Sequence, residues 1–209
     1  TGYTGRLIAQ AAAGRGLGPV LAGRSREAVV ALAAELGCES RVFDLADPVR
    51  VAAELAGCGV VIHCAGPFSA TAAPMIAACL AARIHYTDIT GEIGVFEHAF
   101  LQDAAARAAG IVVCPGTGFD VVPTDCLALM LAERLPDATR LALGFDSRSS
   151  MSRGTAATSI EGLGHGSCVR EHGVLRRIPL GSRCRRIDFG AGEKLATAIP
   201  WGDVSTAFR

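Results

Sequence analysis

Short apolar runs alternate with longer runs of helical periodicity through the first part of the chain, and this alternation constrains the fold most strongly. The runs typical of strands are 18–23, 40–45, 59–66, 84–90 and 111–116. The helical runs that follow them are 25–37, 47–57, 69–85, 94–110 and 124–136. Strands separated by helices connect as parallel neighbours. The alternation therefore predicts an α/β fold with a doubly wound parallel sheet.

Local signals support several of these boundaries. Ser25 is an expected helix N-cap, and Gly37 is an expected left-handed residue at the end of the same helix. Asp47 and Pro48 form a similar cap at the start of the next helix. The run VVIHC at 60–64 is almost wholly apolar, which predicts a strand covered on both faces.

The pattern changes after Pro123. A helix is expected over 153–166, and further strands are expected at 139–145, 167–180, 183–190 and 194–201, with a turn at His172–Gly173. Neighbouring strands joined by turns indicate a mixed or antiparallel sheet. We therefore expect two domains, 1–125 with the parallel sheet and 126–209 as part of a second α+β lobe.

Composition narrows the functional classes. Half of the 209 residues are hydrophobic and the net charge is zero, which does not favour nucleic acid as a partner. No apolar run reaches the length of a membrane span, and no basic and apolar leader is visible. The eight cysteines lack zinc-site spacing and mostly lie in apolar runs, so we expect no metal, and free thiols in the cytoplasm.

The opening TGYTG places Gly2 and Gly5 directly before a helix. Glycines let the backbone turn tightly and approach a pyrophosphate, whose charge the free N–H groups of the helix N-terminus then bind. An ordinary helix-capping turn is the alternative. Followed by the strand–helix alternation, the turn favours dinucleotide binding.

Arg24 ends the first recognisable strand, 19 residues after Gly5. An acidic residue near this position would bind the ribose of NAD, whereas an arginine accommodates the 2′-phosphate of NADP. Arg24, supported by Ser25, therefore predicts NADP in preference to NAD. The alternative is a solvated surface arginine.

Two further stretches belong to the predicted cofactor site. Asp44 could accept a hydrogen bond from the adenine amino group, or could equally cap the turn that follows it. The segment CAGPF ends the strand nearest the expected ligand crevice, and its Gly66 permits close approach. Pro67 and Phe68, together with Ala65, could flank the nicotinamide; a simple strand–helix turn is the alternative.

Polar side chains gather after two later strands. HYTDITGE carries Tyr86, Asp88 and Glu92, and PGTGFDVVPTD carries Asp120. Carboxyl ends of parallel strands meet at one edge of a sheet, so these four residues are the catalytic candidates. Either stretch taken alone is more typical of a structural loop.

In this order, TGYTGR, LAGRS, CAGPF, HYTDITGE and PGTGFDVVPTD resemble the saccharopine dehydrogenase-like oxidoreductases. The later SRGTAATSIEGLG, RRIDFG and IPWGDVSTAF resemble the branch that includes the trans-acting enoyl reductases. The resemblance implies a Rossmann domain and a second α/β lobe over the substrate. It also implies that Gly2, Tyr3, Thr4, Gly5 and Arg6 bind the pyrophosphate, Arg24 the adenosine phosphate, and Gly66–Phe68 the nicotinamide end.

Members of that family are usually longer, and a strand with a Gly-Ala dipeptide usually precedes TGYTG. We therefore expect a chain cut at both ends, without the central strand of its sheet. Strands 19–22 and 60–64 would then lie about 10 Å apart, or would have shifted to close the slot.

The combined expectation is an NADP-dependent oxidoreductase that transfers hydride to or from a small-molecule or acyl-type substrate with a C=N, C=O or enoyl group. A short-chain dehydrogenase is nearly excluded, because neither Tyr3 nor Tyr86 is followed four residues later by lysine. A non-catalytic NAD(P) sensor and an acyl-handling protein stay open, and so does a homodimer.

Overall fold

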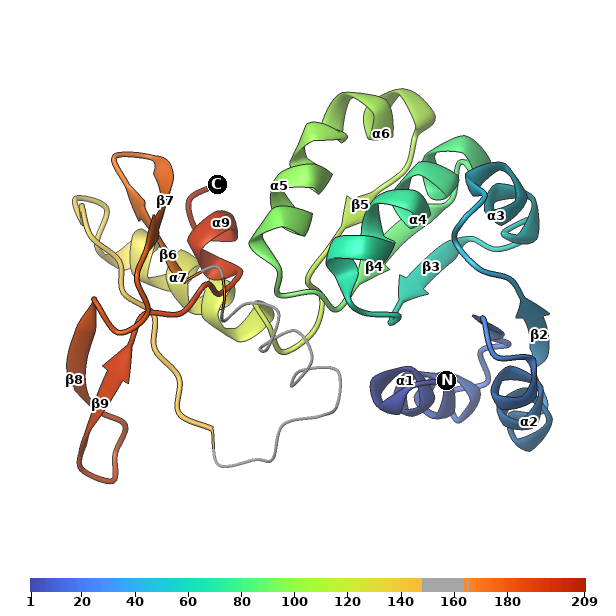
Figure 1. Cartoon of the computed structure of the whole chain (residues 1–209), viewed down its shortest axis with the longest axis horizontal. Helices are drawn as coiled ribbons and strands as arrows, with labels where there is room; N and C mark the ends of the chain where they lie inside the picture. The colour runs from blue at the N-terminus through green and yellow to red at the C-terminus, as the bar shows by residue number, and fades with distance from the viewer. Residues whose placement is uncertain (148–163, 165) are drawn as a thin grey trace. The chain divides into compact units, whose positions relative to one another are not determined.

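The structure is a computed structural model that describes residues 1–147, 164 and 166–209 (Figure 1). The chain divides into two compact units. Unit 1 comprises Thr1–Asp88 and His98–Pro115, and unit 2 comprises Ile89–Glu97 and Gly116–Arg209. These compact units are not evidence for independently folding domains, so the predicted domain boundary near residue 125 stays a prediction.

Unit 1 has the expected alternation of helices and parallel strands. Its elements are α1 (Tyr3–Ala13), β1 (Val20–Gly23), α2 (Arg26–Leu36), β2 (Glu39–Val42), α3 (Pro48–Glu54), β3 (Val60–His63), α4 (Phe68–Ala82), β4 (His85–Asp88), α6 (Asp103–Ala109) and β5 (Val113–Cys114). The helix α5 (Ile93–Leu101) runs from unit 2 into unit 1. The parallel ladders are β1–β2 and β3–β4–β5.

The predicted caps are present. Ser25 Oγ accepts the Ala28 N–H, and Gly37 ends α2 with φ of 66°. Asp47 accepts hydrogen bonds from the backbone at the start of α3. The run expected as one helix over 94–110 is divided into α5 and α6. Helices α3 and α4 pack together, burying Val51 and Ile76.

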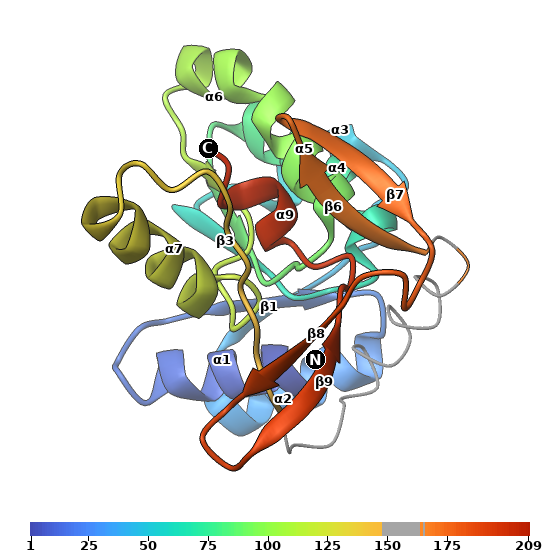
Figure 2. The same cartoon turned by 90° about the vertical axis from the view of Figure 1, so that its left-hand side faces the viewer.

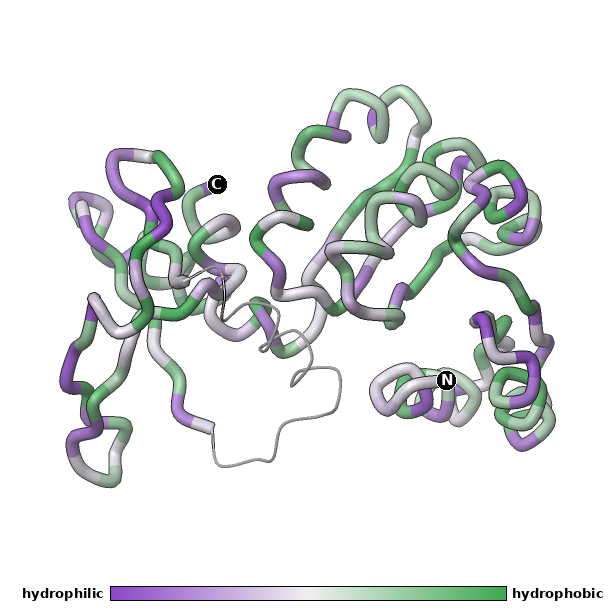
Figure 3. Tube along the Cα trace, viewed as in Figure 1, coloured by the Kyte–Doolittle hydropathy of each residue, from purple (hydrophilic) through white to green (hydrophobic). Residues whose placement is uncertain are grey.

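The strands β1 and β3 do not pair with each other. Among the described residues, β1 is bonded only to β2, and β3 only to β4. No described strand lies between them in a common ladder, and the predicted separation of about 10 Å or a shift that closes the slot stays a prediction. The expectation that both faces of β3 are covered is wrong, because Val60 is 51% exposed and Ile62 is 49% exposed. Hydropathy shows this strand as an apolar run (Figure 3). An apolar sequence therefore predicted the strand but not its covering.

The described part of unit 2 contains α7 (Val122–Arg134), α9 (Asp203–Thr206) and two separate antiparallel hairpins, beside the first part of α5 (Figure 2). The strands of the hairpins are β6 (Ser167–Glu171), β7 (Val174–Ile178), β8 (Cys184–Asp188) and β9 (Glu193–Thr197). The turn predicted at His172–Gly173 is confirmed, with φ of 50° and 78°.

Two other expectations for this part have different outcomes. The strand expected over 139–145 is wrong, since this stretch has no ladder partner and runs as irregular backbone. Its apolar side chains pack without pairing: Phe145 lies against Trp201, with ring centroids 4.6 Å apart. The helix expected over 153–166 falls almost wholly outside the described residues. No helix in the described part of the chain is both long and apolar enough to cross a membrane.

Candidate functional site

The glycine turn begins α1 and leaves its N-terminus uncapped by any side chain. Gly2 is the N-cap residue, in extended conformation, and the first turn contains no acidic residue. A Cβ atom added at Gly5 would lie 3.5 Å from Cys64 Cβ, so the turn is next to the carboxyl end of β3. Unsatisfied N–H groups at this place, without a competing carboxylate, suit an anionic phosphate.

Of the residues expected to bind the cofactor's phosphates and adenosine, some already have side-chain or backbone partners and one does not. Arg6 forms a bidentate ion pair with Glu35 of α2, in which its two terminal nitrogens lie 2.9 and 3.0 Å from the two carboxylate oxygens. Arg24 is exposed and has no ion pair with any residue that the structure describes. Asp44 Oδ1 accepts the Ala46 N–H at 2.9 Å, as in the turn-capping alternative. Of the two predicted arginines, Arg24 is thus the one without an acidic partner in the described residues, and it is available to bind a phosphate.

The Cys64–Phe68 turn is held by a threonine that sequence reasoning missed. Thr71 Oγ1 lies 2.6 Å from Ala65 O and 3.0 Å from Pro67 O, and it also lies 3.1 Å from His63 Nε2. The His63 ring meets the Phe68 ring edge to face, with centroids 5.5 Å apart. This network fixes the turn predicted to flank the nicotinamide.

His63 is a neutral part of that network. Burial lowers its pKa to about 4. Because Thr71 donates its single hydroxyl proton to a backbone carbonyl, the Nε2–H of His63 donates to the threonine oxygen. The i+8 spacing of the two residues gave no signal in the sequence.

Tyr86 and Asp88, two of the catalytic candidates, form a buried pair on β4. The tyrosine hydroxyl donates to Asp88 Oδ2 at 2.6 Å, and their exposed fractions are 1% and 0%. Burial, and then the Asp88 charge, raise the pKa of Tyr86 well above its ordinary value. Contact of either residue with a substrate stays a prediction.

The other two candidates, Glu92 and Asp120, lie in unit 2. The Glu92 N–H donates to Thr90 Oγ1 at 3.1 Å. Burial, followed by repulsion from Asp203 and Asp125, raises the pKa of Asp120 to about 7. Its Oδ1 is buried without a hydrogen-bond partner among the described residues. The two acidic neighbours were not predicted, although Asp203 stands in the noted stretch IPWGDVSTAF.

The sequence of residues 1–114, which carries most of unit 1, matches the family model of the saccharopine dehydrogenase NADP-binding domain. That match covers more than half of the chain. The chain belongs to this family.

Relatives and a solved structure agree with the membership. A Mycobacterium tuberculosis protein, provisionally named a trans-acting enoyl reductase, is 31% identical over 177 residues, which are 77% of this chain and 42% of that protein. The trans-acting enoyl reductase of Mycobacterium leprae is 31% identical over 65% of this chain and 34% of its own length. This member of the saccharopine dehydrogenase family thus spans less than half of these curated relatives.

The fold is also that of a solved family structure. The apo saccharopine dehydrogenase (L-Glu forming) from Saccharomyces cerevisiae superposes with a TM-score of 0.61 over 94% of this chain and 47% of its own, at 14% identity. The α/β architecture with parallel strands is therefore confirmed.

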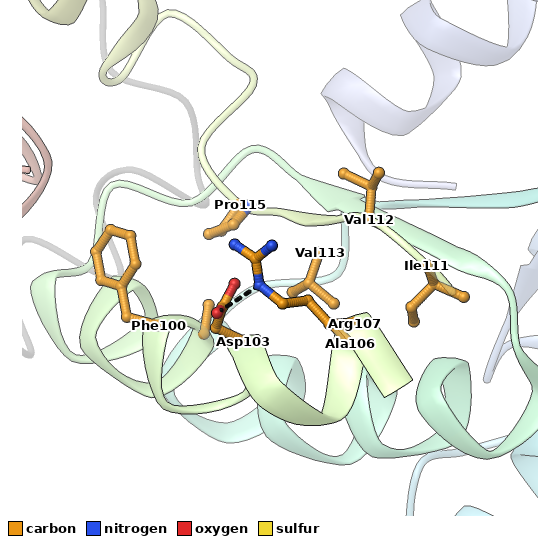
Figure 4. A pocket seen from close by; sticks show the side chains of 9 residues that line it. Phe100, Asp103, Ala106, Arg107, Ile111, Val112, Val113 and Pro115 are labelled. Atoms are coloured by element: carbon orange, nitrogen blue, oxygen red, sulfur yellow. Dashed lines mark hydrogen bonds and ion pairs between the residues drawn. The ribbon is translucent and has the colours of Figure 1, made fainter. Parts of the chain in front are cut away.

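A hollow of about 360 Å³ beside β5 contains none of the predicted site residues (Figure 4). Phe100, Val112 and Pro115 line it, and the ion pair between Arg107 and Asp103 (2.8 Å) lies within it. No group of side chains in the described ranges has an arrangement that could bind a metal ion. The candidate residues of this saccharopine dehydrogenase-family chain are therefore the two turns and the Tyr86–Asp88 pair of unit 1 and, separately, Glu92 and Asp120 of unit 2.

Proposed function

We propose that this chain is the cofactor-binding part of an NADP-dependent oxidoreductase. The observation that carries the proposal is the uncapped N-terminus of α1, which lies against the end of β3 beside the Cys64–Phe68 turn. Glycine turn, free helix N-terminus and strand end are the parts of a dinucleotide site. Membership of an NADP-binding family supports the same reading.

The residues fit the cofactor as follows. The N–H groups at the start of α1, from Tyr3 to Gly5, would hold the pyrophosphate, and Arg24 the 2′-phosphate. Ala65, Gly66, Pro67 and Phe68 would line the nicotinamide end, with Thr71 and His63 keeping this turn in place. NADP is favoured over NAD because Arg24 is exposed and is not already neutralised by a described acidic partner.

The reaction we propose is the reduction of a polarised double bond. Bound NADPH supplies the hydride, and a proton must reach the other atom of the bond. Among the candidates, Asp120 is suited to give that proton, because a carboxyl group with a pKa of about 7 is partly protonated at neutral pH. Tyr86 holds its proton too tightly for this role.

The substrate class we favour is an enoyl group on an acyl chain, since the relatives are named enoyl reductases. C=N and C=O substrates are the other members of the proposed class. All eight cysteines are free thiols, which suits a reducing compartment, and we propose the cytoplasm.

The test of cofactor choice is Arg24→Ala, with NADPH and NADH titrated by calorimetry. Loss of a charge-assisted contact should weaken NADPH by about ten- to hundredfold and leave NADH within about twofold. The matched control is Arg50→Ala, an exposed arginine of α3, which should change neither affinity. Equal weakening of both cofactors by Arg24→Ala would overturn the NADP assignment, and absence of binding by the unaltered chain would overturn the cofactor site.

A further inference from the structure

Three chain segments that are far apart in sequence meet in unit 2 around Asp120. They are the loop 89–92, the loop 116–121 that leads into α7, and the start of α9. A Cβ atom added at Gly91 would lie 1.5 Å from Asp120 Oδ2, so the carboxyl group packs directly on this glycine. A Cβ at Gly202 would lie 2.6 Å from Val121 and 3.3 Å from Gly91 O. The two glycines allow α9 to approach Asp120 closely.

This approach brings further carboxylates to the same place. Asp203 is the first residue of α9, and it is hydrogen-bonded to Thr124 and to Asp125 of α7. Thr206, the last residue of α9, donates to Asp125 Oδ1 at 2.8 Å. In the described residues, Asp120 Oδ1 and Asp203 Oδ1 are both buried without a partner. A carboxyl–carboxylate hydrogen bond needs a proton, so the Asp203–Asp125 pair keeps one proton and carries the remaining negative charge beside Asp120.

Among the residues that the structure describes, the charged groups that act on Asp120 are acidic. They are Asp203 from α9 and Asp125 from α7. The loop 89–92 adds Glu92 as its one ionisable residue. Glu97 of α5 is engaged elsewhere, with Ser205 (2.5 Å), Arg170 (3.3 Å) and Arg209 (3.1 Å). No cation in this set favours the ionised form of Asp120.

We propose that Asp203 is a positioning residue for the reaction: from the start of α9 it keeps the proton on Asp120 until the substrate takes it. The inference rests on the proposed function, in which Asp120 is the proton donor. Burial removes water from the donor, and the neighbouring carboxylate makes loss of the proton costly. The role of Asp203 is electrostatic, so an isosteric amide should abolish it while leaving the packing of α9 intact.

The test uses Asp203→Asn in the full chain, with ¹³C-labelled aspartate, and the Asp120 carboxyl signal assigned by its loss in Asp120→Asn. The pH titration of Asp120 should move about one unit to lower pH, a tenfold loss of proton affinity. Asp137→Asn is the matched control, because Asp137 is exposed beyond the end of α7 and should leave the titration unchanged. Asp125→Asn should give a smaller shift in the same direction, and it serves as the second variant if Asp203→Asn does not fold.

The second readout is the pH profile of NADPH-dependent enoyl reduction. In Asp203→Asn, the decrease of activity at high pH should begin at a lower pH, by the same shift as the Asp120 titration. KM for NADPH should stay unchanged. An unmoved Asp120 titration in folded Asp203→Asn would overturn the inference whatever the activity. A titration that moves while the activity profile does not would leave the electrostatic coupling standing and overturn Asp120 as the donor. These outcomes separate the failure of the inference from the failure of the proposed function.

Discussion

His63 in unit 1 and Asp120 in unit 2 are both kept neutral at slightly acidic pH, but by different surroundings. Burial lowers the pKa of His63 to about 4, and the ring has a hydrogen-bond partner in Thr71. Burial and acidic neighbours raise the pKa of Asp120 to about 7, and one of its oxygens has no described partner. The His63 ring is thus hydrogen-bonded within a network, whereas Asp120 Oδ1 has no hydrogen-bond partner among the described residues.

The difference extends to the groups around them. In unit 1 the buried Tyr86–Asp88 pair is hydrogen-bonded at 2.6 Å. The buried side-chain atoms without a partner, among the residues described, are on Asp120, Ser167 and Asp203, all in unit 2. Buried polar groups are usually satisfied, and the exceptions tend to have a chemical role. The comparison therefore favours a supporting role for the unit 1 pair and a chemical role for Asp120.

The largest effect on stability should come from Tyr86→Phe, which removes the hydrogen bond of the buried pair in unit 1. Removal of the hydroxyl leaves a buried carboxylate without this donor, and the free energy of unfolding should fall by about 2–3 kcal/mol. Urea unfolding followed by circular dichroism measures this. Tyr3→Phe is the control, since Tyr3 is 74% exposed and its change should cost less than about 0.5 kcal/mol. Similar losses for both would show that the pair is not structural.

Gly91→Ala should destabilise the chain by about 2 kcal/mol, because the new methyl group overlaps the Asp120 carboxyl group. Gly94→Ala provides the control: a Cβ there meets nothing within 4 Å, and alanine favours the helix α5. Thermal unfolding distinguishes the two variants. If Gly91→Ala were as stable as Gly94→Ala, the close packing of Asp120 on the loop 89–92 would be wrong.

The smallest effect concerns pH. The folded pKa of Asp120, about 7, exceeds its ordinary value of 3.8, so its stabilising contribution is complete below pH 4 and is lost as pH rises through 7. We expect this contribution to the free energy of unfolding to fall by about 1 kcal/mol between pH 4 and 7, after allowance for solvent screening. His63 acts in the opposite direction: its contribution is present above pH 6.5 and is lost as pH falls through 4.

The single tryptophan of the chain, Trp201, lies in unit 2 against Phe145 and reports on this region by fluorescence. Between pH 4 and 7 the free energy of unfolding of the unaltered chain, measured in urea by this signal, should fall relative to that of Asp120→Asn. The opposite contribution of His63 is present in both chains and cancels in this difference. An unchanged slope in Asp120→Asn would place the titrating group elsewhere.

Periodicity and capping residues predicted most of unit 1. Ser25, Gly37 and Asp47 mark helix ends because their effects are local, and the alternation implied parallel strands. The exposure of Val60 and Ile62 was not predictable, because covering depends on elements distant in sequence. The same reason explains the failed strand at 139–145, where apolar residues indicated an extended backbone but a strand needs a neighbour to pair with.

The candidate site was predicted in parts. Glycine spacing identified the turn at Gly2–Gly5, and its position beside Cys64 agrees with the expected crevice. Tyr86, Asp88 and Asp120 were selected by residue type, but residue type alone could not tell a satisfied pair from an unsatisfied carboxyl group. Asp203 was missed as a neighbour of Asp120 because more than 80 residues separate them.

The open edge of β3 has a practical consequence for colloidal stability. An apolar, β-branched strand with unpaired N–H and C=O groups is a template on which another chain can add a strand. Among the described residues β3 has a ladder partner on one side only, and the exposed Val60 and Ile62 side chains on its face add apolar surface that a neighbouring molecule can contact at high concentration. Light scattering over a dilution series therefore belongs beside each titration, so that a change in affinity is not confused with self-association.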